Sequence, residues 1–111
     1  MLPEDRIRLQ HMLEAAVQAR QFTHGRDPSH LESDRMLLFA LVKCLEIIGK
    51  AAGKVSAETR RHSPAIPWRN MAAMRNRLIH AYFDVDPEVV RQTVEAELPK
   101  LIEDLQALLQ A

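Results

Sequence analysis

The segment MLLFALVKCLEIIGKAAG, residues 36–53, constrains the fold more than any other part of the chain. It is apolar around almost the whole circumference of the helix that its length predicts. Its polar side chains form one narrow stripe, at Lys43, Glu46, Lys50 and Lys54. A helix with so little wet surface lies at the centre of a helical domain, and in a chain of 111 residues part of it is expected to meet a second subunit. We expect this helix to begin near residues 31–34 and end near Gly53, with a close helix approach at Gly49.

Two further long helices are expected on either side of this segment in the sequence. The first runs from Pro3 to about Phe22, because proline suits the first turn and acidic side chains follow it at the positive end of the helix dipole. The third runs from Trp68 to about Tyr82, directly after Pro67.

The last part of the chain predicts a fourth helix, in which Asp86 is the N-cap and Pro87 the first helical residue. Pro99 is expected to kink this helix or to split it in two. A short helical turn opened by Ser56 precedes the third helix. The sequence thus predicts an all-α fold, an up-and-down bundle of four main helices with a short extra turn, in a single domain over residues 1–111.

The composition agrees with helix and limits the classes of function. Three glycines and 5% aromatic residues favour helix over sheet. The 15 basic and 15 acidic residues cancel, so a contact with nucleic acid must come from a local patch. The longest apolar run, residues 36–42, is too short to span a membrane, and the N-terminus MLPEDRIRLQ has no signal-peptide core. The single cysteine, Cys44, agrees with a reducing cytoplasm, where we expect the protein to be.

The stretch MRNRLIHAYFDVDPE, residues 74–88, carries the candidate chemistry. On a regular helix with about 100° per residue, Arg75 falls in the middle of the apolar face. The apolar residues within about 80° of it are Trp68, Met71, Ala72, Leu78, Ile79, Tyr82 and Phe83. A guanidinium cannot lose its proton, so Arg75 needs an anion, a carbonyl group or an open cleft. A snorkelling or ion-paired structural arginine explains the position equally well.

A polar strip borders that face and contains Arg69, Asn76 and His80. A lone histidine there is more often an ordinary surface residue than a catalyst, and a lone tyrosine such as Tyr82 is usually half-buried with its hydroxyl at the rim. In a regular helix Arg75 and His80 are about 140° apart. They converge only if Arg75 reaches across, if the helix is distorted near its end, or if a dimer cleft wraps round it.

The run from Arg75 to Tyr82 resembles the signature of the HEPN superfamily, which is arginine, a polar residue, three more residues and histidine. The extended form Arg-x4-His-x-Tyr resembles the HepT-like ribonuclease toxins. The segments LEIIGKAAGKVS, IPWRNMAAMRNRLIHAYFDVD and AELPKLIEDL are similar to the family's second helix, central stretch and tail. The likeness therefore spans most of the chain. Lys50 is a departure, because relatives often carry an acidic residue after the glycine.

The resemblance implies a homodimeric, metal-independent endoribonuclease that cuts tRNA or mRNA in a cleft shared by two subunits. An activated 2′-OH would attack the adjacent phosphorus while His80 moves a proton as base or acid, since histidine gains and loses a proton near neutral pH. Arg75 would neutralise the phosphate and Asn76 would orient the phosphate or His80. Arg69 and Arg77 would be further contacts to RNA. No metal or cofactor is implied, and the five histidines lack ligand spacing.

The resemblance also implies a partner, a nucleotidyltransferase antitoxin of the MntA kind, which uses ATP to add AMP groups to the motif tyrosine, here Tyr82. A nucleotide phosphate beside Arg75 and His80 would occupy the place of the RNA phosphodiester. The chain would then be the toxin of a type VII-like toxin–antitoxin pair. Two alternatives are a non-catalytic HEPN module that binds nucleotide or docks onto a nucleotidyltransferase, and a purely structural helical dimer.

Overall fold

The computed structural model describes residues 1–80 and 84–110, and every regular element in them is helical. The two longest helices are α1 (Pro3–Thr23) and α2 (Arg35–Lys54). The other elements, in chain order, are the 3₁₀ helix η1 (Pro28–Ser33), α3 (Ala57–Arg61), α4 (Trp68–Ala72), α5 (Met74–Leu78), α6 (Pro87–Gln92), the π-helical segment η2 (Thr93–Glu97) and α7 (Leu98–Gln110). None of the helices in this part of the chain is long and apolar enough to cross a membrane.

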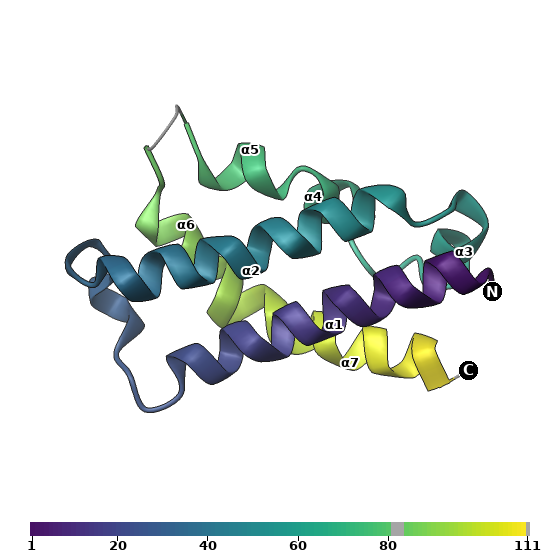
Figure 1. Cartoon of the computed structure of the whole chain (residues 1–111), viewed down its shortest axis with the longest axis horizontal. Helices are drawn as coiled ribbons and strands as arrows, with labels where there is room; N and C mark the ends of the chain where they lie inside the picture. Colours follow the sequence, from purple (N-terminus) through teal and green to yellow (C-terminus); the bar gives the residue numbers. More distant parts are fainter. Residues whose placement is uncertain (81–83, 111) are drawn as a thin grey trace.

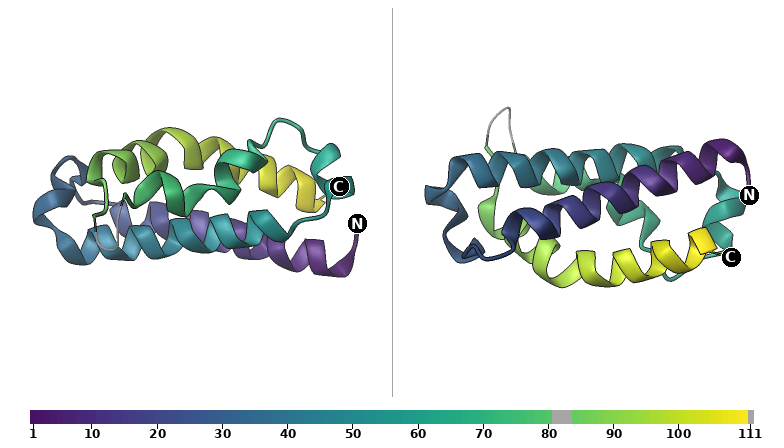
Figure 2. Two further views of the ribbon diagram at one scale, coloured as in Figure 1. Left: turned by 90° about the horizontal axis from the view of Figure 1, so that it is seen from above. Right: turned by 60° about the horizontal axis from the view of Figure 1, so that its bottom comes forward.

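These elements form four limbs that run alternately up and down (Figure 1). The first limb is α1, the second is α2, the third is α4 followed by α5, and the fourth is α6, η2 and α7. The views in Figure 2 agree that α1 and α2 lie side by side and that both termini lie at the same end. The predicted bundle of four main helices is confirmed, and α3 is the short extra turn.

Polar side chains start the helices where the sequence predicted them. Asp34 caps α2 by accepting a hydrogen bond from the N–H of Leu37 at 3.2 Å. Ser56 caps α3 in the same way, with the N–H of Thr59 as donor at 3.3 Å. Asp86 caps α6, and Pro87 is its first residue. Such caps satisfy N–H groups that have no acceptor within the helix, and they depend only on neighbouring residues.

α2 is the central helix, as its apolar composition predicted. It contacts α1 on one side and α4, α5 and α6 of the third and fourth limbs on the other. Its side chains Leu41, Leu45 and Ile48 are 0% exposed. Each of the other three limbs therefore contacts α2, and the fourth limb also packs along α1.

The third limb is not the continuous helix that the sequence predicts over residues 68–82. Ala73 separates α4 from α5, with φ −87° and ψ 12°. α5 ends before Ile79, which is extended at φ −122° and ψ 117°. The prediction is therefore wrong in its continuity and at its C-terminal end, although the start at Trp68 is confirmed.

Gly49 of α2 brings the second and third limbs into backbone contact. A Cβ at this position would lie 2.9 Å from the carbonyl oxygen of Met71 and 2.9 Å from the Cβ of Met74. Those two methionines lie on either side of Ala73 and are 1% and 0% exposed. The turn at Ala73 lets the limb bury one methionine on each side of the contact. The close approach predicted at Gly49 is confirmed.

The fourth limb is interrupted just before Pro99, as predicted. Proline has no N–H, so the carbonyl of Glu95 lacks its usual helical donor. The N–H of Leu98 instead donates to the carbonyl of Thr93, five residues back, which makes η2 a π-helical turn. Thr93 is fully buried, and its hydroxyl donates to the carbonyl of Val89 at 2.7 Å. The limb changes direction between α6 and α7 (Figure 1).

Asp5 ties the start of α1 to α3 and is only 1% exposed. One carboxylate oxygen accepts from the N–H of Ser56 at 3.0 Å, and the other accepts from the hydroxyls of Ser56 and Thr59 at 2.5 and 2.6 Å. Burial raises the pKa of the Asp5 carboxyl, but the hydrogen bonds from Ser56 and Thr59 outweigh it, so its pKa lies below the ordinary value. The sequence predicts only an interaction of the acidic side chains here with the helix dipole, so the buried contact of Asp5 with α3 is a feature of the tertiary structure.

Replacing Gly49 by alanine is expected to destabilise the fold, because the added methyl meets the backbone of Met71. Overpacking of this kind costs roughly 1–3 kcal/mol, which exceeds the gain in helix propensity of about 1 kcal/mol. The matched control is Gly53→Ala, where the nearest atom would be the Cβ of Ala72 at 3.9 Å, so stability stays the same or rises. Denaturant unfolding measures both variants. Equal stability of the two would contradict the close approach.

Replacing Asp5 by asparagine is expected to lower the free energy of unfolding by roughly 1–3 kcal/mol at neutral pH, because hydrogen bonds to a buried charge are lost. The folded-state pKa lies below the unfolded one, so this contribution is present above about pH 4 and disappears as the pH falls further. Unfolding curves of parent and variant should therefore converge in acid. Glu4→Gln, an exposed carboxylate in the same turn, is the control and should show little change. A constant difference at all pH values would contradict the assignment.

Candidate active site

α5 presents Arg75 and Asn76 to solvent. Its buried residues are Met74 and Leu78, both 0% exposed, and they hold the helix against the bundle. Arg75 and Asn76 follow Met74 directly and are exposed. The sequence pattern of one apolar residue, three polar residues and one apolar residue therefore fixes one buried and one exposed side for this short helix.

The prediction that Arg75 lies in the middle of an apolar face is wrong for the described chain. It assumed one regular helix over residues 68–82. The buried face of the limb is instead formed by Met71, Met74 and Leu78, and it does not contain Arg75. An exposed guanidinium keeps its hydration and remains able to bind an anion.

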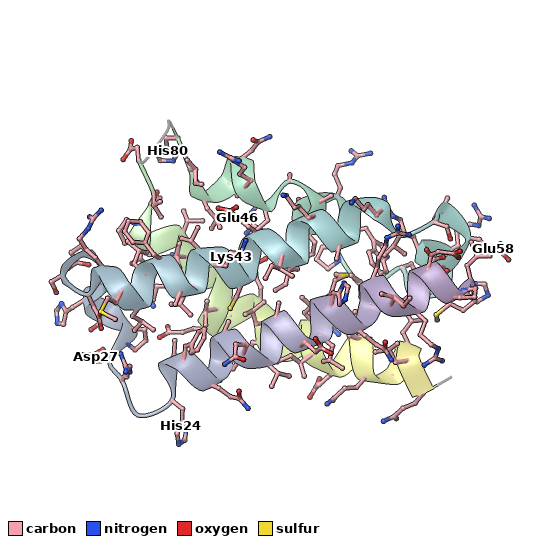
Figure 3. All side chains as sticks on the ribbon, in the orientation of Figure 1. His24, Asp27, Lys43, Glu46, Glu58 and His80 are labelled. Atoms are coloured by element: carbon pink, nitrogen blue, oxygen red, sulfur yellow. The ribbon has the colours of Figure 1, made fainter. Side chains whose placement is uncertain are left out.

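A reversal of the chain after α5 carries His80. The N–H of His80 donates to the carbonyl of Asp84 at 2.9 Å, and Ile79 and Val85 form an antiparallel bridge. The N–H of Asp86 then donates to the carbonyl of Leu78 at 2.9 Å, which closes the reversal at the start of α6. Figure 3 shows His80 projecting from this reversal at the edge of the bundle. Its side chain is 57% exposed.

Two carboxylates flank the ring of His80. Nδ1 lies 3.8 Å from Oδ2 of Asp84, and Nε2 lies 3.9 Å from Oδ2 of Asp86. The sequence pattern does not predict this pair, because it indicates only a helix cap at Asp86 and no role for Asp84. A spacing of four residues is a helical signal for Asp84, but the spacing between His80 and Asp86 carries no signal without the reversal. Among the described residues, no cluster of three or more His, Cys, Asp or Glu side chains has the geometry to hold a metal ion.

Because of the reversal, the directions of the Arg75 and His80 side chains no longer follow from one helical wheel. The angle of about 140° between them applies to a regular helix, and α5 ends before His80 is reached. Distortion near the helix end is one of the three ways of bringing them together that the sequence left open. The helix does end before His80, and the convergence of the two side chains stays a prediction. The predicted polar strip does not lie on one helix, because Arg69 belongs to α4, Asn76 to α5 and His80 to the reversal.

The two arginines predicted as further RNA contacts lie in different surroundings. Nη2 of Arg77 is 2.7 Å from Oε2 of Glu97, so its charge is used to join α5 to η2. The two side chains of this pair are 26% and 33% exposed. Arg69 is exposed on α4. Of the two, Arg69 is the one whose guanidinium faces solvent.

Tyr82, the predicted site of AMP attachment, lies outside the described residues, as do its neighbours in 81–83. His80 and Asp84, on either side of this segment, are described and joined by a backbone hydrogen bond. Tyr82 is the single tyrosine of the chain. Any reaction of a phenolic hydroxyl in this protein is therefore a reaction of one residue.

Comparison with known proteins places these residues in a family. A family model described as "Ribonuclease HepT-like" matches residues 12–108. The chain belongs to the HepT-like ribonuclease family. All the candidate residues, from Arg69 to Asp86, lie within the part of this HepT-like chain that the model matches.

Individual relatives agree with the family match over nearly the same length. The chain is 40% identical over 93 residues to a "Probable ribonuclease HepT" of Thermococcus cleftensis, which covers 84% of each chain. It is 32% identical over 98 residues to a "Putative RNase" of Methanocaldococcus jannaschii, covering 88% of this chain and 90% of the relative. A "Putative RNase" of Caldanaerobacter subterraneus is 32% identical over 102 residues, covering 92% and 91%. No solved structure gives a significant match to this HepT-like chain.

Proposed function

We propose that this protein is a metal-independent endoribonuclease in which Arg75, Asn76 and His80 cleave RNA. The observation that carries the proposal is the exposure of all three side chains on one short segment of a HepT-like chain. Relatives that match most of the chain are named as ribonucleases, which supports the same activity. The substrate class is single-stranded RNA, such as a loop of tRNA or a segment of mRNA, whose 2′-OH is free to approach the phosphorus.

The reaction needs a proton to leave one oxygen and another to reach a second. The 2′-OH loses its proton, its oxygen bonds to phosphorus, the bond from phosphorus to O5′ breaks, and O5′ takes up a proton. His80 serves as base or acid for these transfers. Arg75 neutralises charge on the non-bridging oxygens, and the amide of Asn76 orients the phosphate or the ring. RNA with a 2′-deoxy residue at the cut position is therefore not cleaved.

The active form in this proposal is a homodimer with both motifs at one cleft. α2 supports a second subunit because it exposes large apolar side chains, with Met36 86%, Phe39 45% and Ile47 37% exposed. Such groups on one helix of a small domain are typical of a contact surface. A dimer also brings two sets of exposed cationic side chains to one RNA, which matters because the zero net charge of the chain leaves attraction to local groups.

The proposal includes regulation by a nucleotidyltransferase partner, as in a toxin–antitoxin pair. The partner transfers AMP from ATP to the hydroxyl of Tyr82, and pyrophosphate leaves. The attached phosphate brings negative charge and acceptor oxygens close in sequence to Arg75 and His80, where it competes with the RNA phosphodiester. A cell would then be harmed by this protein only when the partner is missing.

Replacing His80 by alanine is expected to slow RNA cleavage by at least about 100-fold, the usual contribution of a general acid–base group. Cleavage of a labelled RNA is measured for purified parent and variant in EDTA. His11→Ala, an exposed histidine on α1, is the matched control and should cleave like the parent. Cleavage by His80→Ala at the parent rate contradicts the catalytic assignment, and loss of parent activity in EDTA with recovery in Mg²⁺ contradicts metal independence. Complete absence of cleavage by the parent favours a non-catalytic module that binds nucleotide or docks onto a nucleotidyltransferase.

Co-expression with a nucleotidyltransferase encoded beside the gene is expected to raise the intact mass in steps of about 329 Da, one AMP each. Tyr82→Phe should remove every step, because the chain has one tyrosine. Mass spectrometry of the purified protein measures the additions, and the RNA cleavage assay measures their effect. Additions that persist in Tyr82→Phe, or no addition with ATP and partner present, contradict this part of the proposal.

A further inference from the structure

His80 lies between the carboxylates of Asp84 and Asp86, which differ in exposure and in how well they are held in place. The Asp84 side chain is 72% exposed, and the Asp86 side chain is 30% exposed. Among the described residues, these are the two charged groups within ion-pair distance of the ring. The electrostatic interaction of a carboxylate with a neighbouring group is screened less by water when the carboxylate is less exposed.

Asp86 is anchored at three points. Its Oδ1 accepts from the N–H groups of Glu88 and Val89, at 3.1 and 3.2 Å, as the cap of α6. Its own N–H donates to the carbonyl of Leu78 at 2.9 Å. Its second oxygen, Oδ2, is left to face Nε2 of His80 at 3.9 Å. The same residue thus starts a helix and fixes a negative charge beside one ring nitrogen.

We propose that Asp86 is a positioning residue that keeps a proton on Nε2 of His80, so that Nδ1 is the nitrogen that exchanges a proton with RNA. An N–H at Nε2 faces an anchored acceptor, whereas an unprotonated Nε2 would put a lone pair against a carboxylate. The distance of 3.9 Å needs to shorten to a hydrogen bond, as catalytic contacts often do when substrate binds. The role in catalysis rests on the proposed nuclease function, whereas the pairing itself does not.

The assignment gives each ring nitrogen one task. With Nε2 occupied by Asp86, Nδ1 takes the proton from the 2′-OH if His80 is the base, or gives a proton to O5′ if it is the acid. Among the described residues, the charged group near Nδ1 is the exposed Asp84, which RNA can displace. Asp86 itself does not touch the substrate in this arrangement and acts only through the ring.

The D86N substitution tests the pairing because it keeps the helix cap. Asparagine caps helices as well as aspartate does. With its oxygen in the cap, its NH₂ group replaces Oδ2 and offers Nε2 a donor, so the ring proton should move to Nδ1. Asp86→Ser also keeps a cap but removes the group that faces the ring. Asp34→Asn, which changes the cap of α2 and leaves both carboxylates beside His80 in place, is the control.

Two measurements are made on each variant. Ring ¹⁵N NMR spectra in alkaline solution, with the His80 signals assigned by their loss in His80→Gln, should show Nε2–H in the parent and Asp34→Asn, and mainly Nδ1–H in D86N. Steady-state cleavage should give a kcat at least about tenfold lower in D86N, a smaller loss in Asp86→Ser and an unchanged KM, since a wrong tautomer impairs proton transfer and not binding. Thermal unfolding should be the same in all three variants.

An unchanged tautomer in both D86N and Asp86→Ser overturns the proposal, whatever the cleavage rates are. A tautomer that switches while kcat stays at the parent value overturns the catalytic part of it. A parent protein that cuts no RNA removes the proposed nuclease function, and the NMR comparison still decides whether Asp86 controls the ring of His80. If D86N is unfolded, Asp86→Ser provides the same comparison with a smaller expected change.

Discussion

The close contact at Gly49 is the constraint on which the arrangement of the site depends. Because no side chain separates α2 from the third limb there, the backbone of Met71 lies directly on the central helix. The third limb turns at Ala73 and buries Met74 and Leu78 against the bundle. What remains on the outside of α5 is Arg75 and Asn76. A packing requirement in the core therefore decides which polar groups face solvent.

The reversal between α5 and α6 carries a further exposed side chain, His80. A continuous helix through His80 would have pointed it about 140° away from Arg75. The backbone hydrogen bonds at His80 and Asp86 instead turn the chain back on itself and end at a helix cap. The cap residue is then at the same time a neighbour of the ring. One aspartate thus starts α6 and lies beside the ring of His80, so the position of His80 is coupled to the start of the fourth limb.

Charges divide into those that hold the fold and those left for a ligand. Arg77 is paired with Glu97 between the third and fourth limbs, and the buried Asp5 is satisfied by Ser56 and Thr59. Arg69 and Arg75 are exposed on the two halves of the third limb. Since the chain has no net charge, attraction of RNA must come from such local groups. Of the three arginines that the sequence offered as anion-binding candidates, Arg69 and Arg75 are exposed and Arg77 is paired with Glu97.

The sequence by itself determined the elements that depend on neighbouring residues. The apolar circumference of α2, the caps at Asp34, Ser56 and Asp86, the interruption before Pro99 and the HepT-like motif are all readable from short spacings. Only the tertiary structure decided where the third limb breaks and which carboxylates reach His80. The break lies where Gly49 meets Met71 of another helix, and the two carboxylates lie beside His80 only because the chain reverses between α5 and α6. Helical periodicity cannot reveal them, because it describes one helix at a time and the decisive contacts join two.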